Sequence, residues 1–273
     1  MSDSVSGVRF YYPPWLKSRD TSVDYSKKLE DRMHITKEDI KEGLRRLGLG
    51  KNDVVMVHSS LSSLGYVEGG ADTVIDALLE TVGPHGTVAV PTYSTNAFKY
   101  VEEEDACYEL SIEHMEPYDP ETTPVWTGLI PETFRKRRNA LRSLSPAHSI
   151  AAIGPKAREL TEGDWGEKLQ ELGGCVLMLG VSITNNSSAE GAAVEALTES
   201  GYKEKTARKG RYVTTLGPWP DLTQMEELYL ERRVMKIGRI GQATVRLLKA
   251  KPMVGLTQEA VKKDPERFCP RTY

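Results

Sequence analysis

The sequence predicts a layered α/β/α sandwich with a mainly parallel central sheet. Residues 53–90 read as a strand, an amphipathic helix and a second strand, and a connection of this kind requires the two strands to be parallel. A third apolar run, Cys175–Val181, is followed by another helical pattern, so strands and helices alternate along the chain. That alternation is typical of helices packed on both faces of one sheet.

Composition and charge exclude several classes of function. The 273 residues carry a formal net charge of -3, so sequence-independent binding to nucleic acid is not expected. No apolar run approaches the roughly 18 residues that a membrane helix needs, and the N-terminus lacks the apolar core of a secretory signal. We therefore expect a cytoplasmic protein without membrane association. The three cysteines are too few and too scattered for a disulfide framework or a zinc site, and we expect no metal: Cys107, Cys175 and Cys269.

Residues 1–35 form a predicted N-terminal arm ahead of a single domain, residues 36–273. The stretch FYYPPWL places aromatic residues around a proline pair, which is incompatible with a helix. Such an arm either lies across the surface of its own chain or contacts a second subunit in a homodimer. Both alternatives stay open.

The first predicted helix, Thr36–Leu47, has clear start and stop signals. Thr36 and Asp39 have the spacing of a capping box, and Gly48 stands where a helix favours a left-handed residue. Apolar residues recur on one face between these two ends. The buried strand 53–57 follows directly.

The remaining elements come in a regular order up to one irregular segment. After the strand at 53–57 we predict an amphipathic helix carrying Val74 to Val82, a turn at 83–86 and a strand at 87–90; beyond the irregular segment we predict a helix at 127–136, strands at 148–154 and 175–181, helices at 188–197 and 221–235, a strand at 244–250 and a last short helix at 257–263. Residues 101–124 show little periodicity, and a stretch of this length in a compact protein is usually functional or mobile.

Three of the predicted strands end in polar side chains. The first ends in His58, Ser59, Ser60, Ser62 and Ser63, the second in Thr92, Tyr93 and Ser94, and the third in the run from Ser182 to Ser188. Ligands of open α/β sheets bind at the carboxyl ends of the strands, so these groups predict a hydrogen-bonding wall. Such a wall suits a ligand with many amides and few charges, such as the pantetheine arm of coenzyme A. The alternative is that each hydroxyl caps the helix that follows it.

The irregular segment 101–124 is strongly acidic and contains no Lys or Arg. Its carboxylates predict either a solvated surface loop or a wall that attracts a cationic substrate. They are Glu102, Glu103, Glu104, Asp105, Glu109, Glu113, Glu116, Asp119 and Glu121.

Several stretches, in the right order, resemble the aminoglycoside 3-N-acetyltransferases, also called antibiotic N-acetyltransferases. They are VHSSLSSLGYVEGGADTVIDALLETVGPHGTVAVPTYS (57–94), TPVWTGLIPETFRKRRNALRS (123–143), PAHSIAAIG (146–154), LGGCVLMLGV (172–181) and GRIGQATVRLL (238–248). The resemblance implies one α/β domain, acetyl-CoA as acyl donor and direct transfer of the acetyl group to an amine. It also implies cofactor contacts from His58, Ser59, Ser60, Ser62, Thr92, Tyr93, Ser94, Arg142 and Ser149. Because the family's acceptors are cationic, it favours Glu102, Glu103, Glu104 and Asp105 as substrate-binding residues.

The sequence departs from the family pattern at two places. Where the family usually has a histidine before a proline, this chain has Ser145. Where the family has a later histidine that handles the proton, this chain has Glu190 in one alignment and no histidine in either. We therefore expect the base to be His148, Glu195 or Glu190, since desolvation can raise the pKa of a carboxylate enough for it to act as a base.

The sequence as a whole predicts an acetyl-CoA-dependent N-acetyltransferase. Its acceptor is expected to be an amine of a small cationic molecule, such as an aminosugar, an aminoglycoside or a biosynthetic intermediate. Because the expected histidines are missing, the alternative is a relative that binds CoA or a small ligand without turnover.

Overall fold

The computed structural model describes residues 34–94, 99–102, 108–111, 118–145, 148–202, 206–209, 212–215 and 220–269. Of the predicted arm, only the last two residues fall within these ranges. The predicted substrate-binding residues Glu103, Glu104 and Asp105 lie outside them. Glu102 ends strand β5, whose side chains are not described.

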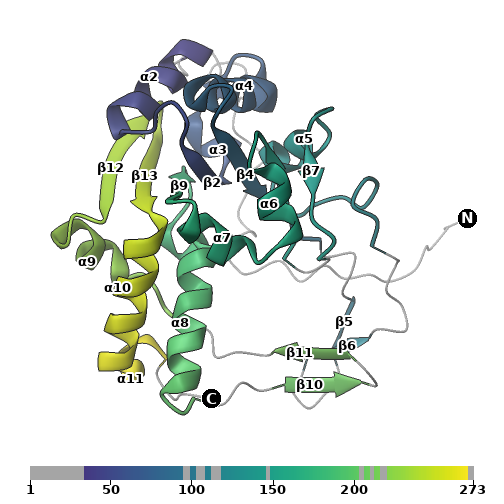
Figure 1. Ribbon diagram of the computed structural model, residues 1–273, viewed down its shortest axis with the longest axis vertical. Helices are drawn as coiled ribbons and strands as arrows, with labels where there is room; N and C mark the ends of the chain where they lie inside the picture. The colour runs from purple at the N-terminus through teal and green to yellow at the C-terminus, as the bar shows by residue number, and fades with distance from the viewer. Residues whose placement is uncertain are drawn as a thin grey trace, which may run out of the picture. The chain divides into compact units, whose positions relative to one another are not determined.

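A mixed sheet of seven strands organises the described part of the chain (Figure 1). Its three central strands are parallel, and the two strands on each side of them run antiparallel to their neighbours. The layered fold class is therefore confirmed, but only the three central strands are parallel, so the sheet is mixed rather than mainly parallel. In spatial order the strands are β12 (Met235–Ile240), β13 (Ala243–Lys249), β9 (Cys175–Leu179), β2 (Val54–Ser59), β4 (Thr87–Pro91), β8 (Ile150–Ile153) and β7 (Leu141–Arg142).

Each central strand buries both of its faces, which explains its unbroken apolar sequence. On β2, Val55 and Val57 point into one hydrophobic core, whereas Val54 and Met56 point into a second core on the opposite face. The same alternation puts His58 on the face of the second core and Ser59 on the face of the first.

Helices cover both faces of the sheet. The first core lies under α2 (Lys37–Leu47), α4 (Gly70–Val82) and α5 (Leu129–Arg135), and the short α3 (Leu61–Leu64) also contributes to it. The second core lies under α6 (Ala157–Glu162), α7 (Trp165–Glu171), α8 (Ser187–Glu199), α9 (Met225–Glu231), α10 (Ala250–Lys263) and α11 (Pro265–Phe268). The long helices α8 and α10 lie side by side in Figure 1 and share this second core.

The chain changes face at β2. The connection from β2 to β4 passes through α4 in the first core, whereas α6 and α7 in the second core precede β9. Because β4 and β9 flank β2 on opposite sides, the strand order reverses there. Reversals of this kind are where ligands of open α/β sheets bind.

Short two-stranded pairs complete the described structure. A parallel pair joins β1 (His34–Ile35) to β3 (Tyr66–Val67). Two antiparallel pairs join β5 (Lys99–Glu102) to β6 (Tyr108–Ser111) and β10 (Thr206–Lys209) to β11 (Tyr212–Thr215). A short 3-10 helix, η4 (Ile183–Asn185), follows β9.

Most predicted elements are confirmed, and two differ in length. The capping box of Thr36 and Asp39 is present, and Gly48 ends α2 at φ 107°. The helix predicted at 221–235 is only α9, because β12 begins at Met235. The helix predicted at 257–263 is α10, which is longer than predicted and starts at Ala250, directly after β13.

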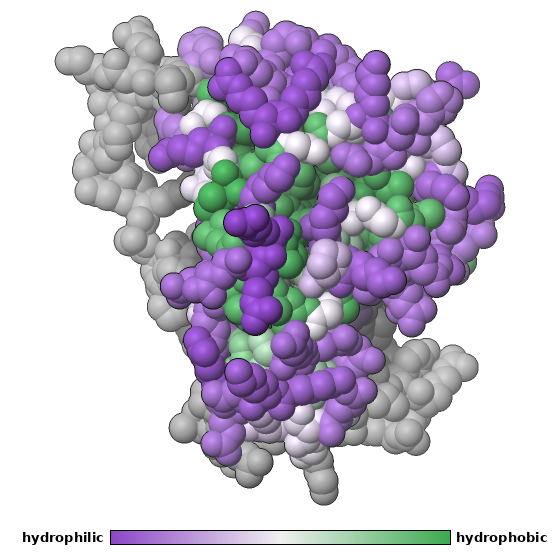
Figure 2. Space-filling model, turned by 60° about the vertical axis from the view of Figure 1, so that its left-hand side comes forward, coloured by the Kyte–Doolittle hydropathy of each residue, from purple (hydrophilic) through white to green (hydrophobic). Residues whose placement is uncertain are grey.

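Strand β12 forms one edge of the described sheet. Figure 2 shows apolar residues gathering among polar ones on this side of the molecule. Ile237 on β12 is 46% exposed, and Lys236 and Arg239 are exposed on the same strand. Charged side chains on an exposed edge disfavour pairing with another strand, so Lys236 and Arg239 disfavour association of a further strand with β12.

Candidate active site at the strand ends

The central strands β2 and β4 separate where they end. Their pairing extends only to Met56 opposite Ala89. Beyond that point β2 continues with β9 as far as Ser59 opposite Leu179, and β4 continues with β8 as far as Pro91 opposite Ile150. The ends of β2 and β4 are therefore not paired with each other.

The segment Trp126–Gly128 takes the place of β2 beside the end of β4. The Thr127 hydroxyl donates to the Pro91 carbonyl at 2.6 Å, and the Trp126 amide donates to the Tyr93 carbonyl at 3.1 Å. A Cβ on Gly128 would lie 4.0 Å from the carbonyl oxygen of Ser59, so the segment also borders β2. The segment Trp126–Gly128 therefore borders the ends of both β2 and β4.

Arg142 fixes the backbone just after β4. Its guanidinium donates to the Thr92 carbonyl at 2.7 Å and to the Thr92 hydroxyl at 3.2 Å, and it also donates to the carbonyls of Pro120 and Thr123. The Ser149 hydroxyl donates to the same Thr92 carbonyl at 2.5 Å. Both Thr92 and Ser149 are fully buried. These hydrogen bonds use most of the donors of Arg142, so its evident role is to hold the tip of β4 in place.

The tips of β2 and β9 are packed tightly against each other. The Ser60 amide donates to the Leu179 carbonyl at 2.9 Å. Gly180 has φ 74°, and a Cβ at this position would lie 2.7 Å from the Cβ of Ser63. A larger residue does not fit here, so glycine is what allows the β9 turn to approach the serines of α3.

Polar atoms without partners gather at these strand ends. Five buried side-chain atoms here have no hydrogen-bond partner among the described residues, although buried polar groups in proteins are nearly always paired. They are His58 Nε2, Ser59 Oγ, Tyr93 Oη, Ser94 Oγ and Ser188 Oγ. Leaving a buried polar group unpaired costs about 1–3 kcal/mol, so five together indicate groups that a ligand completes.

Other polar residues of the predicted wall already have local partners. Asn186 accepts from the Ala189 amide as the N-cap of α8, and Ser182 accepts from the Thr184 amide in the preceding turn. Ser60 bonds with the hydroxyls of Ser62 and Ser63. The capping alternative is therefore correct for Asn186, whereas the unpartnered atoms lie mainly on β2 and just after β4.

Tyr93, which follows β4, lies near titratable side chains of two other segments. The ring of Tyr93 contacts the ring of His148 edge to face, with centroids 5.4 Å apart. Burial raises the pKa of Tyr93 to about 12, while Ser187 lowers this pKa and Glu190 raises it. These two residues of the first turn of α8 therefore lie near the Tyr93 hydroxyl.

Desolvation prepares two members of this group for proton transfer. Burial raises the pKa of the Glu190 carboxyl above its usual range, and partial desolvation lowers the pKa of His148, although His148 keeps an exposed surface. His148 is therefore a neutral imidazole at pH 7, and Glu190 binds a proton more readily than an exposed glutamate does. Perturbed acids and bases of this kind cluster at catalytic sites.

Glu195, the third predicted base, lies apart from this group. It is exposed on α8, and its carboxylate accepts a hydrogen bond from Gln258 of α10 at 2.8 Å. It therefore faces the neighbouring helix, and the structure brings together only His148 and Glu190 of the three predicted bases.

His58 is the most strongly perturbed histidine of the described chain. It is 5% exposed, and burial lowers its pKa to about 4. Its imidazole is neutral at pH 7, and Nε2 has no partner among the described residues. His58 can therefore exchange a neutral hydrogen bond with a ligand at the end of β2.

Sequence reasoning missed two features that shape the site. One is the segment Trp126–Gly128, in which Trp126 is 61% exposed and Gly128 has a positive φ. The other is Arg246 on β13, which forms a two-pronged ion pair with Glu226 and donates to the Val181 carbonyl at 3.3 Å. Arg246 thereby holds the turn that follows β9.

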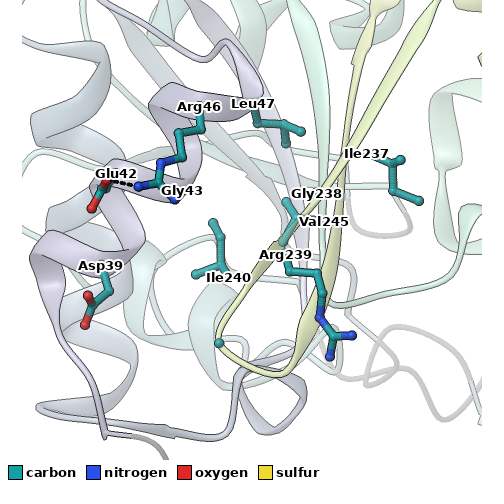
Figure 3. Close-up of a pocket in the computed structure, with 11 residues that line it drawn as sticks. Asp39, Glu42, Gly43, Arg46, Leu47, Ile237, Gly238, Arg239, Ile240 and Val245 are labelled. Atoms are coloured by element: carbon teal, nitrogen blue, oxygen red, sulfur yellow. Dashed lines mark hydrogen bonds and ion pairs between the residues drawn. The ribbon is translucent and has the colours of Figure 1, made fainter.

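A separate surface pocket of about 380 Å³ lies between α2 and β12 (Figure 3). Its charged groups are already satisfied, because Glu42 pairs with Arg46, Asp39 caps α2 and Arg239 donates to the Gln242 carbonyl. Two strands, β13 and β9, lie between β12 and β2 in the sheet. The pocket carries none of the unpartnered polar atoms, so we place the site at the strand ends.

Two further searches cover only the part of the chain that the structure describes. Within it, no three His, Cys, Asp or Glu side chains are grouped closely enough to hold a metal ion. None of its helices combines the length and the apolar character that a membrane crossing requires.

Comparisons with known proteins identify the family of this chain. The sequence profile of a family described as aminoglycoside 3-N-acetyltransferase matches residues 56–262. Aminoglycoside N(3)-acetyltransferase III from a Salmonella species is 35% identical over 203 residues, which cover 69% of this chain and 67% of that enzyme. The enzyme of the same name from Enterobacter cloacae is 34% identical over a region that covers 56% of this chain and 58% of that enzyme. The chain thus spans about two thirds or less of these relatives.

A Bacillus subtilis relative matches over more of its length. The SPbeta prophage-derived aminoglycoside N(3')-acetyltransferase-like protein YokD is 30% identical over 241 residues, covering 78% of this chain and 87% of that protein. The crystal structure of YokD superposes with a TM-score of 0.75 at 26% identity, covering 88% of this chain and 99% of that one. AAC-IIIb, solved with CoASH, shares the fold with a TM-score of 0.69 at 24% identity, covering 88% of this chain and all of that one. As its sequence motifs predicted, the chain belongs to the aminoglycoside 3-N-acetyltransferase family.

Proposed function

We propose that this protein is an acetyl-CoA-dependent N-acetyltransferase that acts on an amine of a small cationic acceptor. The observation that carries the proposal is the group of buried, unpartnered polar atoms at the ends of β2 and β4 and the start of α8. Family membership supports acetyl transfer, and a neighbour of the same fold was solved with CoASH. The proposal places the enzyme in the cytoplasm, where acetyl-CoA is available.

The donor arm is assigned to the ends of β2 and β4. Its amides can exchange hydrogen bonds with His58, Ser59 and Ser94, whose polar atoms are buried and unpaired in the described chain. Each satisfied hydrogen bond contributes about 0.5–1.5 kcal/mol. Arg142 and Ser149, which the resemblance implied as cofactor contacts, hold Thr92, and their contact with the donor stays a prediction.

Glu190 is our first candidate for the base. An ammonium has no lone pair, so the acceptor amine must lose a proton before or during attack. Glu190 has a raised pKa, lies near the Tyr93 hydroxyl and, in one of the two possible alignments, occupies the position of the family histidine. His148 touches the same tyrosine ring and is the second candidate.

The acceptor is proposed to be cationic, as an aminosugar is. The names of the relatives support this class, and the acidic segment 101–124 supplies carboxylates that attract cations. The assignment of Glu102, Glu103, Glu104 and Asp105 to this role stays a prediction.

A thiol-release assay tests the proposal. Purified protein is incubated with acetyl-CoA and gentamicin, sisomicin, apramycin or spermine, and CoA thiol is measured against time. We expect amine-dependent release, together with CoA binding that weakens about fivefold or more in Ser59→Ala. Thr81→Val is the matched control, because its hydroxyl bonds within α4, to the Ala77 carbonyl. CoA binding without thiol release for any amine would support the alternative, a relative that binds without turnover.

A further inference from the structure

Hydrogen bonds hold the backbone on both sides of Tyr93. The Thr92 carbonyl that precedes it accepts from both Arg142 and Ser149, and the Thr92 amide donates to the Ser149 carbonyl at 2.7 Å. The Tyr93 carbonyl accepts from the Trp126 amide. The backbone is therefore fixed on both sides of this residue, and the His148 ring supports its aromatic ring at 5.4 Å.

The rigidity contrasts with the state of the hydroxyl itself. Tyr93 Oη is buried and lacks a hydrogen-bond partner of good geometry among the described residues. A buried tyrosine hydroxyl usually has a partner. A donor that is fixed in place and has no partner of its own has the properties that transition-state stabilisation requires, because no reorganisation is needed when charge develops.

The neighbours of the hydroxyl indicate which charge it meets. Glu190, the first candidate for the base, lies near the hydroxyl, and His148, the second, touches the ring. A donor next to the base lies close to the reacting atoms rather than to the distant parts of the donor arm. Tyr93 also keeps its proton throughout the neutral range, because its pKa is raised to about 12. It therefore donates a hydrogen bond without becoming a proton source.

We propose that the Tyr93 hydroxyl donates a hydrogen bond to the thioester carbonyl oxygen as that oxygen becomes negative. This inference rests on the proposed function and changes the role of Tyr93 from a contact of the donor arm to a catalytic residue. The amine nitrogen attacks the carbonyl carbon, a C–N bond forms, and the amine proton passes to the Glu190 carboxylate. The C–O π electrons move to oxygen, where Tyr93 stabilises them. When the carbonyl re-forms, the C–S bond breaks and the CoA thiolate takes the proton from Glu190.

The removal of the single hydroxyl tests this role. Tyr93→Phe keeps the ring against His148 and deletes only the donor, and we expect kcat to fall about 10²-fold while KM for acetyl-CoA changes less than threefold. Because the hydroxyl has no hydrogen-bond partner of good geometry among the described residues, its loss should leave the urea midpoint unchanged or raise it. A lower rate in a protein of equal or greater stability separates a catalytic role from a structural one.

Tyr229→Phe is the matched control. Tyr229 is also a fully buried tyrosine, but its hydroxyl bonds with the Thr257 hydroxyl at 2.5 Å between α9 and α10. Its removal should lower the urea midpoint and leave kcat unchanged, which is the reverse of the pattern expected for Tyr93.

The outcomes separate the two proposals. Amine-dependent thiol release by the wild-type protein with an unchanged kcat in Tyr93→Phe would overturn the role of Tyr93 and leave the acetyltransferase intact. A rise in KM for acetyl-CoA with kcat unchanged would overturn it too, because Tyr93 would then be a binding residue. No thiol release by the wild type with gentamicin, sisomicin, apramycin or spermine would overturn both proposals.

Discussion

His58 should make the protein lose stability as the pH falls below neutral. Its imidazole is 5% exposed on β2, and desolvation lowers its pKa from 6.5 to about 4. The unfolded chain takes up this proton near pH 6.5, whereas the folded chain resists it down to about pH 4. The stabilisation from neutral His58 is therefore complete above pH 6.5 and is lost as the pH falls through this window.

The size of the effect follows from the two pKa values. Each pH unit between them corresponds to about 1.4 kcal/mol, so the full loss below pH 4 is about 3 kcal/mol. By pH 4.5 most of it, about 2.5 kcal/mol, should be gone. This is a large part of the stability of a typical domain, which is about 5–15 kcal/mol.

Urea unfolding of the ligand-free protein at 25 °C, from pH 7.5 to pH 4.5, measures this effect. The wild type is compared with His58→Gln and His58→Leu, which lack the titrating group. The carboxylates and the other histidines titrate in all three proteins and cancel in the comparison. Both variants should lose about 2.5 kcal/mol less than the wild type over this range. Parallel curves for the three proteins would refute the account, because His58 would then titrate alike in both states.

Three further predictions concern the base, the acceptor side and the packing of the strand tips. Glu190→Gln should lower kcat/KM about 10²–10⁴-fold, because only the carboxylate accepts the proton. It should also remove an acidic limb of the pH–rate profile that lies above pH 4.5, since burial raises the pKa of Glu190. A limb that persists in Glu190→Gln and disappears in His148→Gln would assign the base to His148. Trp126 is 61% exposed beside the end of β4, where its indole face can contact a cationic acceptor. Trp126→Ala should therefore raise KM for the acceptor about fivefold, through loss of a cation–π contact worth about 1 kcal/mol, whereas Leu230→Ala, exposed on α9, should not. An effect confined to KM for acetyl-CoA would place Trp126 on the donor side instead. Gly180→Ala should lower the free energy of unfolding in urea by about 2–4 kcal/mol, because Gly180 has a positive φ and an added Cβ would lie 2.7 Å from Ser63. Gly191→Ala, at an open position within α8, should raise it by about 0.5–1 kcal/mol. Equal effects of the two substitutions would contradict the packing described here.

The layered fold was predictable because its signals are local. The capping box at Thr36 and the apolar runs at 53–57 and 175–181 each determine an element without distant contacts. Strand β12, MKIGRI, was missed because three of its residues are charged or glycine and it lies at the edge of the sheet. Edge strands bury little, so their sequences carry little pattern.

The site was predictable only in part, for a physical reason. The polar residues after β2 and β4 could be read directly, because strand ends carry ligand contacts in this class of fold. Whether a given hydroxyl is free or capped depends on its tertiary partners: Asn186 caps α8, whereas Ser188, two residues later, has an unpaired oxygen. The contacts of Trp126 with Tyr93 and of Arg246 with Val181 join residues far apart in sequence, and no local pattern reports them.

Hydrogen–deuterium exchange with and without CoA tests the central claim most directly. If the donor arm completes the unpaired polar groups at the strand ends, CoA should slow exchange in residues 58–63, 92–94 and 187–190. Residues 237–241, which line the pocket beside α2, should be unaffected. Protection confined to that pocket, with no change at the strand ends, would contradict the account.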